Sequence, residues 1–359
     1  MANHASRLDD VLERVTNREA PGIAVVKLSG SEVERRASAG KADLASGLAT
    51  STNTVHLWFS MTKIVTATAV MQLAERGALG LDDPVASFVE DFPKPRAGWP
   101  EVRVRHLLSH SSGLPNPIPV RWVHPAGEAG QDPREFAQDL LRRHSRLRFP
   151  AGSKAVYTNL GYIALGELIG TASGQPYEDY VMSEILAPLA MDRTGFGYGT
   201  LGTDVATGYQ RRLHPMTPLF RLMLPKGIVG RKQGRFVAFN RFLVDGPAYG
   251  GLVGSAEDAG RFMAIHLNQG EFESGRLLSP ESVRAMQRIQ ASGRKIEVGF
   301  GWFRRGRDGS RDPAYLEHLG GGGGFWNMMR IYPEQRVGVL AMGNSTSYDH
   351  ESVAQAALD

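Results

Sequence analysis

The chain has 359 residues, no cysteine, and 41 lysines and arginines against 37 aspartates and glutamates, for a net charge of +4. Disulfide and thiolate chemistry are therefore excluded, and the small positive charge does not by itself indicate a nucleic-acid-binding protein. Because single cores seldom grow beyond about 250 to 300 residues, the length predicts two lobes.

The N-terminal segment is polar and typical of a helix that runs to about residue 18. It lacks the apolar core of a signal peptide, and no stretch of the chain approaches the ~18 apolar residues needed to cross a bilayer. We therefore expect a cytoplasmic protein, with a chain that has lost its signal peptide as the alternative. Two strands follow at 22–28 and 33–39, and the turn residues between them predict a hairpin.

The next segment carries S-x-x-K at Ser60 and Lys63, followed by an uncharged run to Ala74 that is typical of a core-buried helix. One helical turn separates the two residues, so the hydroxyl and the amine can meet. Burial and a helix N-terminus both favour a neutral lysine, which can take the proton of a serine nucleophile. The structural alternative is that Ser60 is only an N-cap, although a capping box needs Glu or Gln where Lys63 stands. The same spacing recurs at Ser38 and Ser292, but among polar and glycine residues.

Asp82-Asp83-Pro84 predicts the start of a helix, and the chain from there to about residue 245 is typical of helices and long loops. We assign residues 84–244 to a mainly helical lobe, and residues 1–83 and 245–359 to a lobe that carries a sheet. Residues 209–244 hold eight arginines or lysines and no acidic residue, interleaved with apolar side chains. They form either a solvated insertion, or a lid that offers an apolar wall to an acyl chain and basic groups to an acidic substrate or an anionic membrane surface.

Tyr157-Thr158-Asn159 lies just before an apolar helix expected at 160–169, and no other Y-x-N occurs in the chain. Asn159 could cap that helix, with Tyr157 packed on its first turn. The functional interpretation is that Tyr157 holds or passes a proton, since a nearby lysine cation lowers the pKa of a phenol, and that Asn159 gives its amide to a substrate carbonyl.

From residue 299 the pattern changes to strands at 299–304, 314–318, 325–332 and 337–342, which we expect to join the N-terminal hairpin in one antiparallel sheet. His318-Leu319-Gly320 ends one of them and continues into a run of glycines. Glycines let backbone N–H groups approach a developing oxyanion, whereas the structural alternative is a hairpin loop.

These three motifs, in this order, resemble those of the serine β-lactamase and penicillin-binding-protein superfamily, most closely its class C β-lactamase and family VIII esterase branch. Segments 106–115, 149–159, 250–255 and 318–325 resemble recurring segments of the same family, so the likeness covers nearly the whole chain. It implies an α+β fold with a five-stranded antiparallel sheet flanked by helices on both faces, a mainly helical lobe, and a site in the cleft between them.

The resemblance implies that Ser60 is the nucleophile, that Lys63 and Tyr157 share the role of general base, and that the backbone N–H groups of Ser60 and Gly321 form the oxyanion hole. It implies four substrate-binding or oxyanion positions, Asn159, His318, Gly320 and Gly321. We expect no cofactor and no metal: His106 and His110 are four residues apart but lack the glutamate of H-E-x-x-H.

Many β-lactamases have K-T-G where this chain has His318-Leu319-Gly320. An imidazole is mostly neutral at pH 7 and Leu319 has no hydroxyl, so a substrate carboxylate would lose two partners. We therefore expect a serine hydrolase that acts on a carboxylic ester or a related small acyl substrate. The alternatives are a D-stereospecific peptidase or D,D-carboxypeptidase, a β-lactamase, and a non-catalytic binding or scaffold protein.

Overall fold

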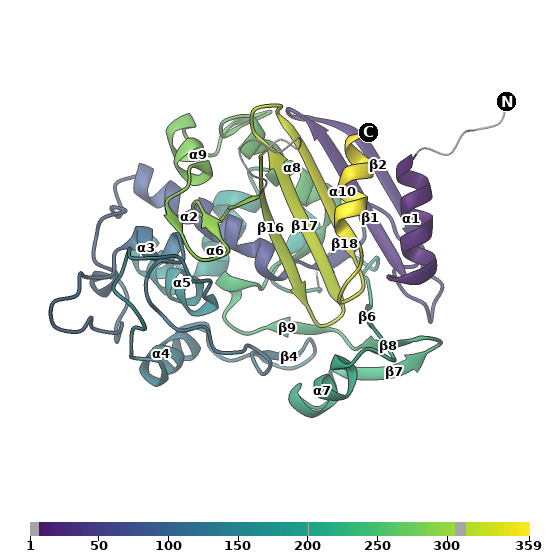
Figure 1. The fold of residues 1–359 in the computed structure, drawn as a ribbon, viewed down its shortest axis with the longest axis horizontal. Coiled ribbons are helices and arrows are strands. Elements are labelled where there is room, and N and C mark those ends of the chain that lie inside the picture. The colour runs from purple at the N-terminus through teal and green to yellow at the C-terminus, as the bar shows by residue number, and fades with distance from the viewer. Residues whose placement is uncertain (1–6, 200, 306–313) are drawn as a thin grey trace.

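The computed structural model describes residues 7–199, 201–305 and 314–359, except for the side chains of residues 216 and 219 (Figure 1). The fold is α+β, and its main sheet is antiparallel with eight strands in the order β13-β14-β15-β16-β17-β18-β1-β2. Five strands are long: β1 (Gly22–Ser29), β2 (Glu32–Gly40), β16 (Tyr315–Gly322), β17 (Phe325–Tyr332) and β18 (Val337–Gly343). Three are short: β13 (Ala291–Ser292), β14 (Glu297–Val298) and β15 (Phe303–Arg305).

The expectation of a five-stranded sheet is wrong, because the three short strands extend the edge beyond β16. A strand of two or three residues is too short to show the alternation of apolar and polar side chains that marks a strand in a sequence. The expected union of the N-terminal hairpin with the C-terminal strands is confirmed, with Val25 of β1 opposite Ala341 of β18.

Helices cover both faces of the main sheet (Figure 1). On one face α1 (Arg7–Arg18) packs against α10 (His350–Leu358), and its buried residues Leu8, Leu12 and Val15 recur at helical spacing. On the other face α8 (Ala256–Leu267) packs against β1 and β18. Strand β1 is therefore buried on both sides, which explains its continuous apolar run Ile23–Val26.

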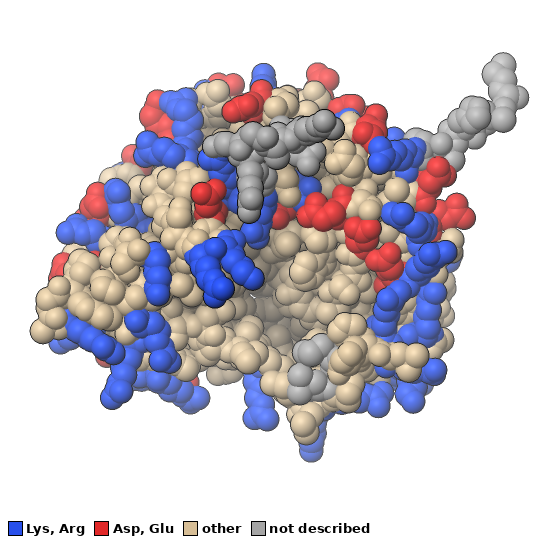
Figure 2. Space-filling model, in the orientation of Figure 1, with Lys and Arg blue, Asp and Glu red and all other residues tan. Residues whose placement is uncertain are grey.

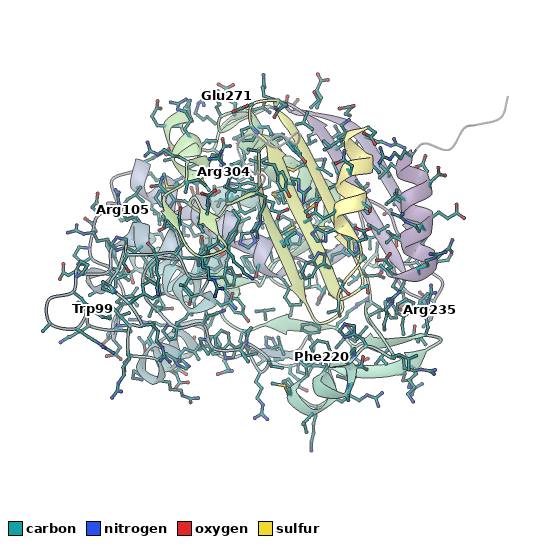
Figure 3. All side chains as sticks on the ribbon, viewed as in Figure 1. Trp99, Arg105, Phe220, Arg235, Glu271 and Arg304 are labelled. Atoms are coloured by element: carbon teal, nitrogen blue, oxygen red, sulfur yellow. The ribbon has the colours of Figure 1, made fainter. Side chains whose placement is uncertain are left out.

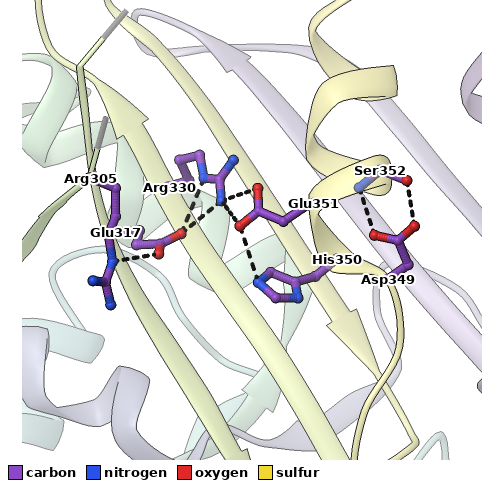
Figure 4. Close-up of polar contacts among 7 residues, drawn as sticks. All are labelled: Arg305, Glu317, Arg330, Asp349, His350, Glu351 and Ser352. Carbon is purple, nitrogen blue, oxygen red and sulfur yellow. Dashed lines mark hydrogen bonds and ion pairs between the residues drawn. The ribbon is translucent and has the colours of Figure 1, made fainter. Parts of the chain in front are cut away.

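A buried ion-pair network attaches α10 to the sheet (Figure 4). Arg330 of β17 donates to Glu317 of β16 at 2.8 and 3.2 Å, and to Glu351 of α10 at 2.9 Å. Arg330 and Glu317 each keep only 4% of their side-chain surface exposed, whereas Glu351 keeps 57%. Arg305 gives Glu317 a further bond at 3.2 Å, so the buried carboxylate has two cationic partners.

The remaining helices lie mostly to one side of the sheet (Figure 1). They are α2 (Thr62–Glu75), α3 (Val104–Leu108), α4 (Pro133–Arg143), α5 (Asn159–Ser173), α6 (Tyr177–Val181) with a π-helical turn Met182–Leu186, α7 (Met216–Met223) and α9 (Pro280–Gln287). Helix α2 contacts α5 and is buried from Thr62 to Leu73 without an exposed face. In the described residues, no helix has both the length and the apolarity needed to span a bilayer.

The prediction of a helix that starts at Asp82-Asp83-Pro84 is wrong. Only a short 3-10 turn, Val85–Ser87, follows. The Asp83 carboxylate accepts the backbone N–H of Gly80 at 2.7 Å instead of capping a helix ahead of it. Pro84 is extended, with ψ at 130°, and forms a β-bridge with Arg103. A local turn and a tertiary contact therefore replace the helix.

Residues 209–244 fold mainly as strands around one helix. Strands β6 (Gly208–Arg211), β8 (Phe236–Phe239) and β7 (Val229–Gln233) form a small sheet beside α7, and β9 (Phe242–Val244) pairs with β4 (Val123–Pro125). Two further small sheets join β3 (Val55–Leu57), β10 (Val253–Ser255) and β5 (Thr194–Gly195), and β11 (Glu271–Phe272) with β12 (Gly275–Arg276). In Figure 1, β9 and α7 lie below the lower ends of β16 and β17.

Candidate active site

The structure brings Ser60, Lys63 and Tyr157 into direct contact. Ser60 lies in a 3-10 turn, Phe59–Met61, that leads into α2, and Lys63 lies in the first turn of that helix. The amine Nζ of Lys63 donates to the Ser60 hydroxyl at 3.2 Å, and the Tyr157 hydroxyl lies 2.8 Å from the same oxygen. The interpretation of Ser60 as an N-cap is wrong, since Met61 is the N-cap residue of α2 and makes no side-chain capping bond.

A strained residue places this turn. Phe59 has φ at +49°, a left-handed conformation that costs a residue with a side chain about 1–2 kcal/mol. Its ring packs between Phe242 of β9 at 6.2 Å and Phe325 of β17 at 6.5 Å, so the surrounding structure holds the strained turn in place. Residues 209–244 thus reach the immediate neighbour of Ser60.

Lys63 is fully buried without an ion-pair partner among the described residues. Its amine donates to the backbone carbonyl of Tyr249 at 2.7 Å and lies over the rings of Tyr157, Tyr249 and Tyr162 at 5.1, 5.3 and 5.6 Å. Burial lowers the pKa of Lys63 well below its ordinary value, which favours a neutral amine able to accept a proton. Once protonated, the amine would keep the carbonyl and the ring faces as partners.

The pKa of the Tyr157 phenol is shifted upward rather than downward. Burial raises it, and the hydrogen bond from Ser60 opposes this only in part. The expectation of a lowered pKa is wrong because it assumed a cationic lysine, whereas Lys63 is buried and its pKa is depressed. Both shifts favour the neutral form of each group, and a neutral amine is a stronger base than a neutral phenol.

His110 holds the Tyr157 segment in position, a role that the sequence did not reveal. Its ring packs on the Tyr157 ring at a centroid distance of 4.6 Å and a tilt of 42°, and its backbone oxygen accepts the N–H of Val156 at 2.8 Å. Its Nδ1 accepts the N–H of Thr158 at 3.3 Å. His106, considered with it as a metal-ligand pair, instead accepts the N–H of Arg103 at 3.0 Å. The only signal was the place of His110 in a segment, 106–115, that resembles the family.

Asn159 and His318 each present a buried polar atom without a hydrogen-bond partner in the described structure, the side-chain oxygen of Asn159 and Nε2 of His318. Asn159 is the first residue of α5, but its side chain does not cap that helix, whose N-cap residue is Thr158. The capping interpretation is therefore wrong. The His318 ring lies 6.5 Å from that of Tyr157, and burial together with nearby Lys63 lowers its pKa to about 3, so it is neutral at pH 7.

Beyond Glu317, strand β16 pairs only with β17 among the described residues, and its other edge lies beside the Ser60 turn. Its pairing with β15 stops at Glu317, and the backbone beyond contacts the 3-10 turn. A Cβ atom at Gly320 would lie 2.0 Å from the carbonyl oxygen of Trp58, so only glycine allows this approach. The hairpin-loop interpretation is wrong for residues 320–322, which belong to β16 and pair with β17 as far as Gly322 opposite Phe325. The two expected oxyanion donors, the N–H groups of Ser60 and Gly321, belong to these adjoining segments.

Leu319 points away from Ser60. It packs with α1 and α10 on the far face of the sheet, whereas a side chain at Gly320 would face the Ser60 turn. The expectation that Leu319 takes the place of a substrate-binding hydroxyl is therefore wrong.

Figure 2 shows a hollow near the centre of the viewed face, floored by uncharged residues, between the helices and the lower ends of β16 and β17. The turn that carries Ser60 contacts β16, which borders this hollow. Lysines and arginines lie on its upper rim in this view, whereas its floor is uncharged.

Comparisons with known proteins show what the whole chain is similar to. A family model described as Beta-lactamase matches residues 8–359. Esterase EstB of Burkholderia gladioli is 30% identical over 344 residues, covering 89% of this chain and 84% of the relative. D-alanyl-D-alanine-carboxypeptidase/endopeptidase AmpH of Escherichia coli (strain K12) is 24% identical, covering 90% and 79%. The solved structure of an octameric penicillin-binding protein homologue from Pyrococcus abyssi has a TM-score of 0.79 and 27% identity, covering 98% and 76%.

Proposed function

The chain belongs to the beta-lactamase family and is a serine hydrolase, and on that premise we propose that Ser60 forms an acyl-enzyme, preferentially with a carboxylic ester. One observation carries the proposal: the Ser60 hydroxyl contacts a fully buried amine at 3.2 Å and a phenol at 2.8 Å. A serine needs such a neighbouring base before it can attack a carbonyl.

In the proposed acylation, Ser60 attacks the ester carbonyl while its proton passes to neutral Lys63. The N–H groups of Ser60 and Gly321 stabilise the oxyanion, a contribution of about 3–4 kcal/mol for a single donor in a protease. Tyr157, on the other side of the serine oxygen, gives a proton to the departing alkoxide and regains it from Lys63. Water then attacks the acyl group, loses a proton to the same pair of bases, and releases the acid with Ser60 restored.

Asn159 and His318 are proposed to bind the acyl group, since each leaves a buried polar atom unpaired. The preference for esters rests on His318, whose neutral imidazole offers no cation to a substrate carboxylate. Because Gly320 has no side chain, strand β16 packs closely against the Ser60 turn, and we propose that this strand contacts the same substrate.

Labelling with a fluorophosphonate tests the acyl-enzyme. Wild type should gain one adduct per chain by mass spectrometry, and Ser60→Ala should gain none. An equal adduct on Ser60→Ala, or no adduct on the folded wild type, would favour the non-catalytic scaffold. Ser292→Ala, which removes the serine of another S-x-x-K, is the control and should label like wild type.

A D-stereospecific peptidase or D,D-carboxypeptidase is the second candidate, favoured by the similarity to AmpH, and a β-lactamase is the third. Initial rates on a p-nitrophenyl ester, a D-amino-acid amide and nitrocefin, measured in parallel, separate the three. We expect the highest kcat/KM for the ester. A D-amide or nitrocefin turned over faster than the ester would reverse the order.

Within residues 209–244, Phe242 alone is proposed to supply an apolar wall to the acyl chain, because it packs on Phe59 next to Ser60. Phe242→Ala should lower kcat/KM for a medium-chain ester more than for acetate. An unchanged chain-length preference in a folded variant would contradict this.

A further inference from the structure

A surface cavity of about 410 Å³ lies where the end of α1 meets residues 209–244. Its lining includes four arginines, Arg18, Arg211, Arg212 and Arg235, and no acidic residue. No ion pair joins any of these arginines to a carboxylate in the part of the chain that the structure describes. Figure 3 places Arg235 below α1, and Figure 2 shows lysines and arginines gathered in that area.

Helix capping accounts for part of this cluster. Arg211 donates to the backbone carbonyl of Arg18 at 2.5 Å, and Arg235 donates to that of Asn17. Both acceptors belong to the last turn of α1, where the helix dipole favours cations. Capping does not explain the side chains of Arg18 and Arg212, which are exposed and line the same cavity. The four guanidinium groups together can offer several N–H donors to one phosphate.

Two exposed leucines lie within residues 209–244. Leu213, which lines the cavity, is 90% exposed, and Leu222 of α7 is 79% exposed. Phe220 anchors helix α7, because its ring packs on that of Phe239 at 5.8 Å. Leu222 is therefore exposed on a helix that is packed against the protein. A soluble phosphate or a nucleic acid has no apolar part to contact these leucines, whereas a phospholipid bilayer presents phosphates and hydrocarbon side by side.

We propose that this face docks on a bilayer containing anionic phospholipid. The arginine cavity receives headgroup phosphates, Leu213 enters the interfacial region beside them, and the other five cations of residues 209–244 add long-range attraction. The proposal does not depend on the chemistry at Ser60, because the cavity-lining residues include none of the proposed catalytic groups.

Sedimentation of the full chain with vesicles tests this. We expect binding to vesicles of phosphatidylglycerol mixed with phosphatidylcholine, loss of binding in high salt, and little binding to phosphatidylcholine alone. Removing two surface cations with Arg18→Gln/Arg212→Gln should weaken binding roughly 10- to 30-fold. Leu213→Ser should weaken it several-fold at unchanged net charge.

The matched control removes two exposed cations from the helical lobe, Lys94→Gln/Arg146→Gln, and should bind nearly as wild type. Thermal midpoints and hydrolysis of a soluble ester should be unchanged in all of these variants. If both double variants weakened vesicle binding equally, the attraction would be non-specific, and the proposed binding site would be contradicted. Absence of vesicle binding, or stronger binding to glycerophosphate or to a short DNA duplex than to the anionic vesicles, would contradict it as well.

Discussion

Lys63→Met removes the buried amine and shortens the unbranched side chain by one atom, and it should abolish activity while stabilising the fold. A lysine that stays neutral in the folded protein at pH 7 must give up a proton that it holds in the unfolded chain, where its ordinary pKa is 10.5. Each pH unit below that value costs about 1.4 kcal/mol, which gives an upper bound of about 5 kcal/mol at pH 7. The variant loses the bond to the Tyr249 carbonyl, worth about 1–3 kcal/mol.

The net expectation is a variant more stable than wild type by at most about 2–4 kcal/mol at pH 7. The pKa is lower in the folded state, so the unfolded chain binds the extra proton and the stability of wild type rises with pH. The advantage of the variant should therefore shrink toward pH 10.5, by up to about 1.4 kcal/mol per unit wherever folded Lys63 is already neutral. Turnover should fall at least 100-fold, since about 10²–10⁴ is typical for loss of a general base.

Urea unfolding of both proteins across neutral and alkaline pH measures this difference, with ester hydrolysis alongside. Lys295→Met is the matched control, because Lys295 completes another S-x-x-K but is exposed. It should change stability by less than about 0.5 kcal/mol at every pH and leave activity intact. If Lys63→Met were less stable than wild type at pH 7, with a difference independent of pH, Lys63 would be a charged structural residue and the proposed base would be lost.

Three further changes probe other parts of the structure. Tyr157→Phe keeps the ring but removes its hydroxyl, so kcat should drop roughly 10²–10⁴-fold with an unchanged circular dichroism spectrum; a loss below threefold would remove the phenol from proton transfer. Gly320→Ala puts a Cβ 2.0 Å from a backbone carbonyl oxygen and should cost about 1–3 kcal/mol and most of the activity, whereas Gly127→Ala, in open space, should cost neither. Arg330→Ala leaves a carboxylate that is only 4% exposed without its main partner and should cost about 3–5 kcal/mol by urea unfolding. Glu351→Gln, at a position 57% exposed, should cost less than about 1 kcal/mol. If the two variants lost equal stability, the buried Arg330–Glu317 pair would not contribute more than the exposed Arg330–Glu351 pair.

The parts of the fold that could be predicted are those that bury long apolar runs. The charge-free run after Lys63 requires a helix surrounded by protein, and the apolar strand after residue 22 requires a sheet covered on both faces. The spacing from Ser60 to Lys63 placed two side chains on one helical turn without any tertiary information. Their meeting with Tyr157 rested on family resemblance, because no local pattern specifies a contact across 97 residues.

The errors arose where tertiary contacts override local preference. Asp83 has the chemistry of a helix cap but finds a closer donor in Gly80. The direction of the Tyr157 pKa shift depends on the charge of Lys63, which burial decides and composition does not. Leu319 was an avoidable error: side chains alternate along a strand, so a residue next to His318 had to face the opposite side of the sheet.

The burial of α2 from Thr62 to Leu73 has a consequence for how this protein loses activity. Its backbone amides between Thr62 and Leu73 have no exposed face through which a local opening could admit solvent. Hydrogen exchange there should proceed only through the largest cooperative opening of the molecule, while the rim of the hollow exchanges earlier. Heat inactivation would then follow global unfolding, and the amine of Lys63, in the first turn of α2, would be among the last groups to leave its place.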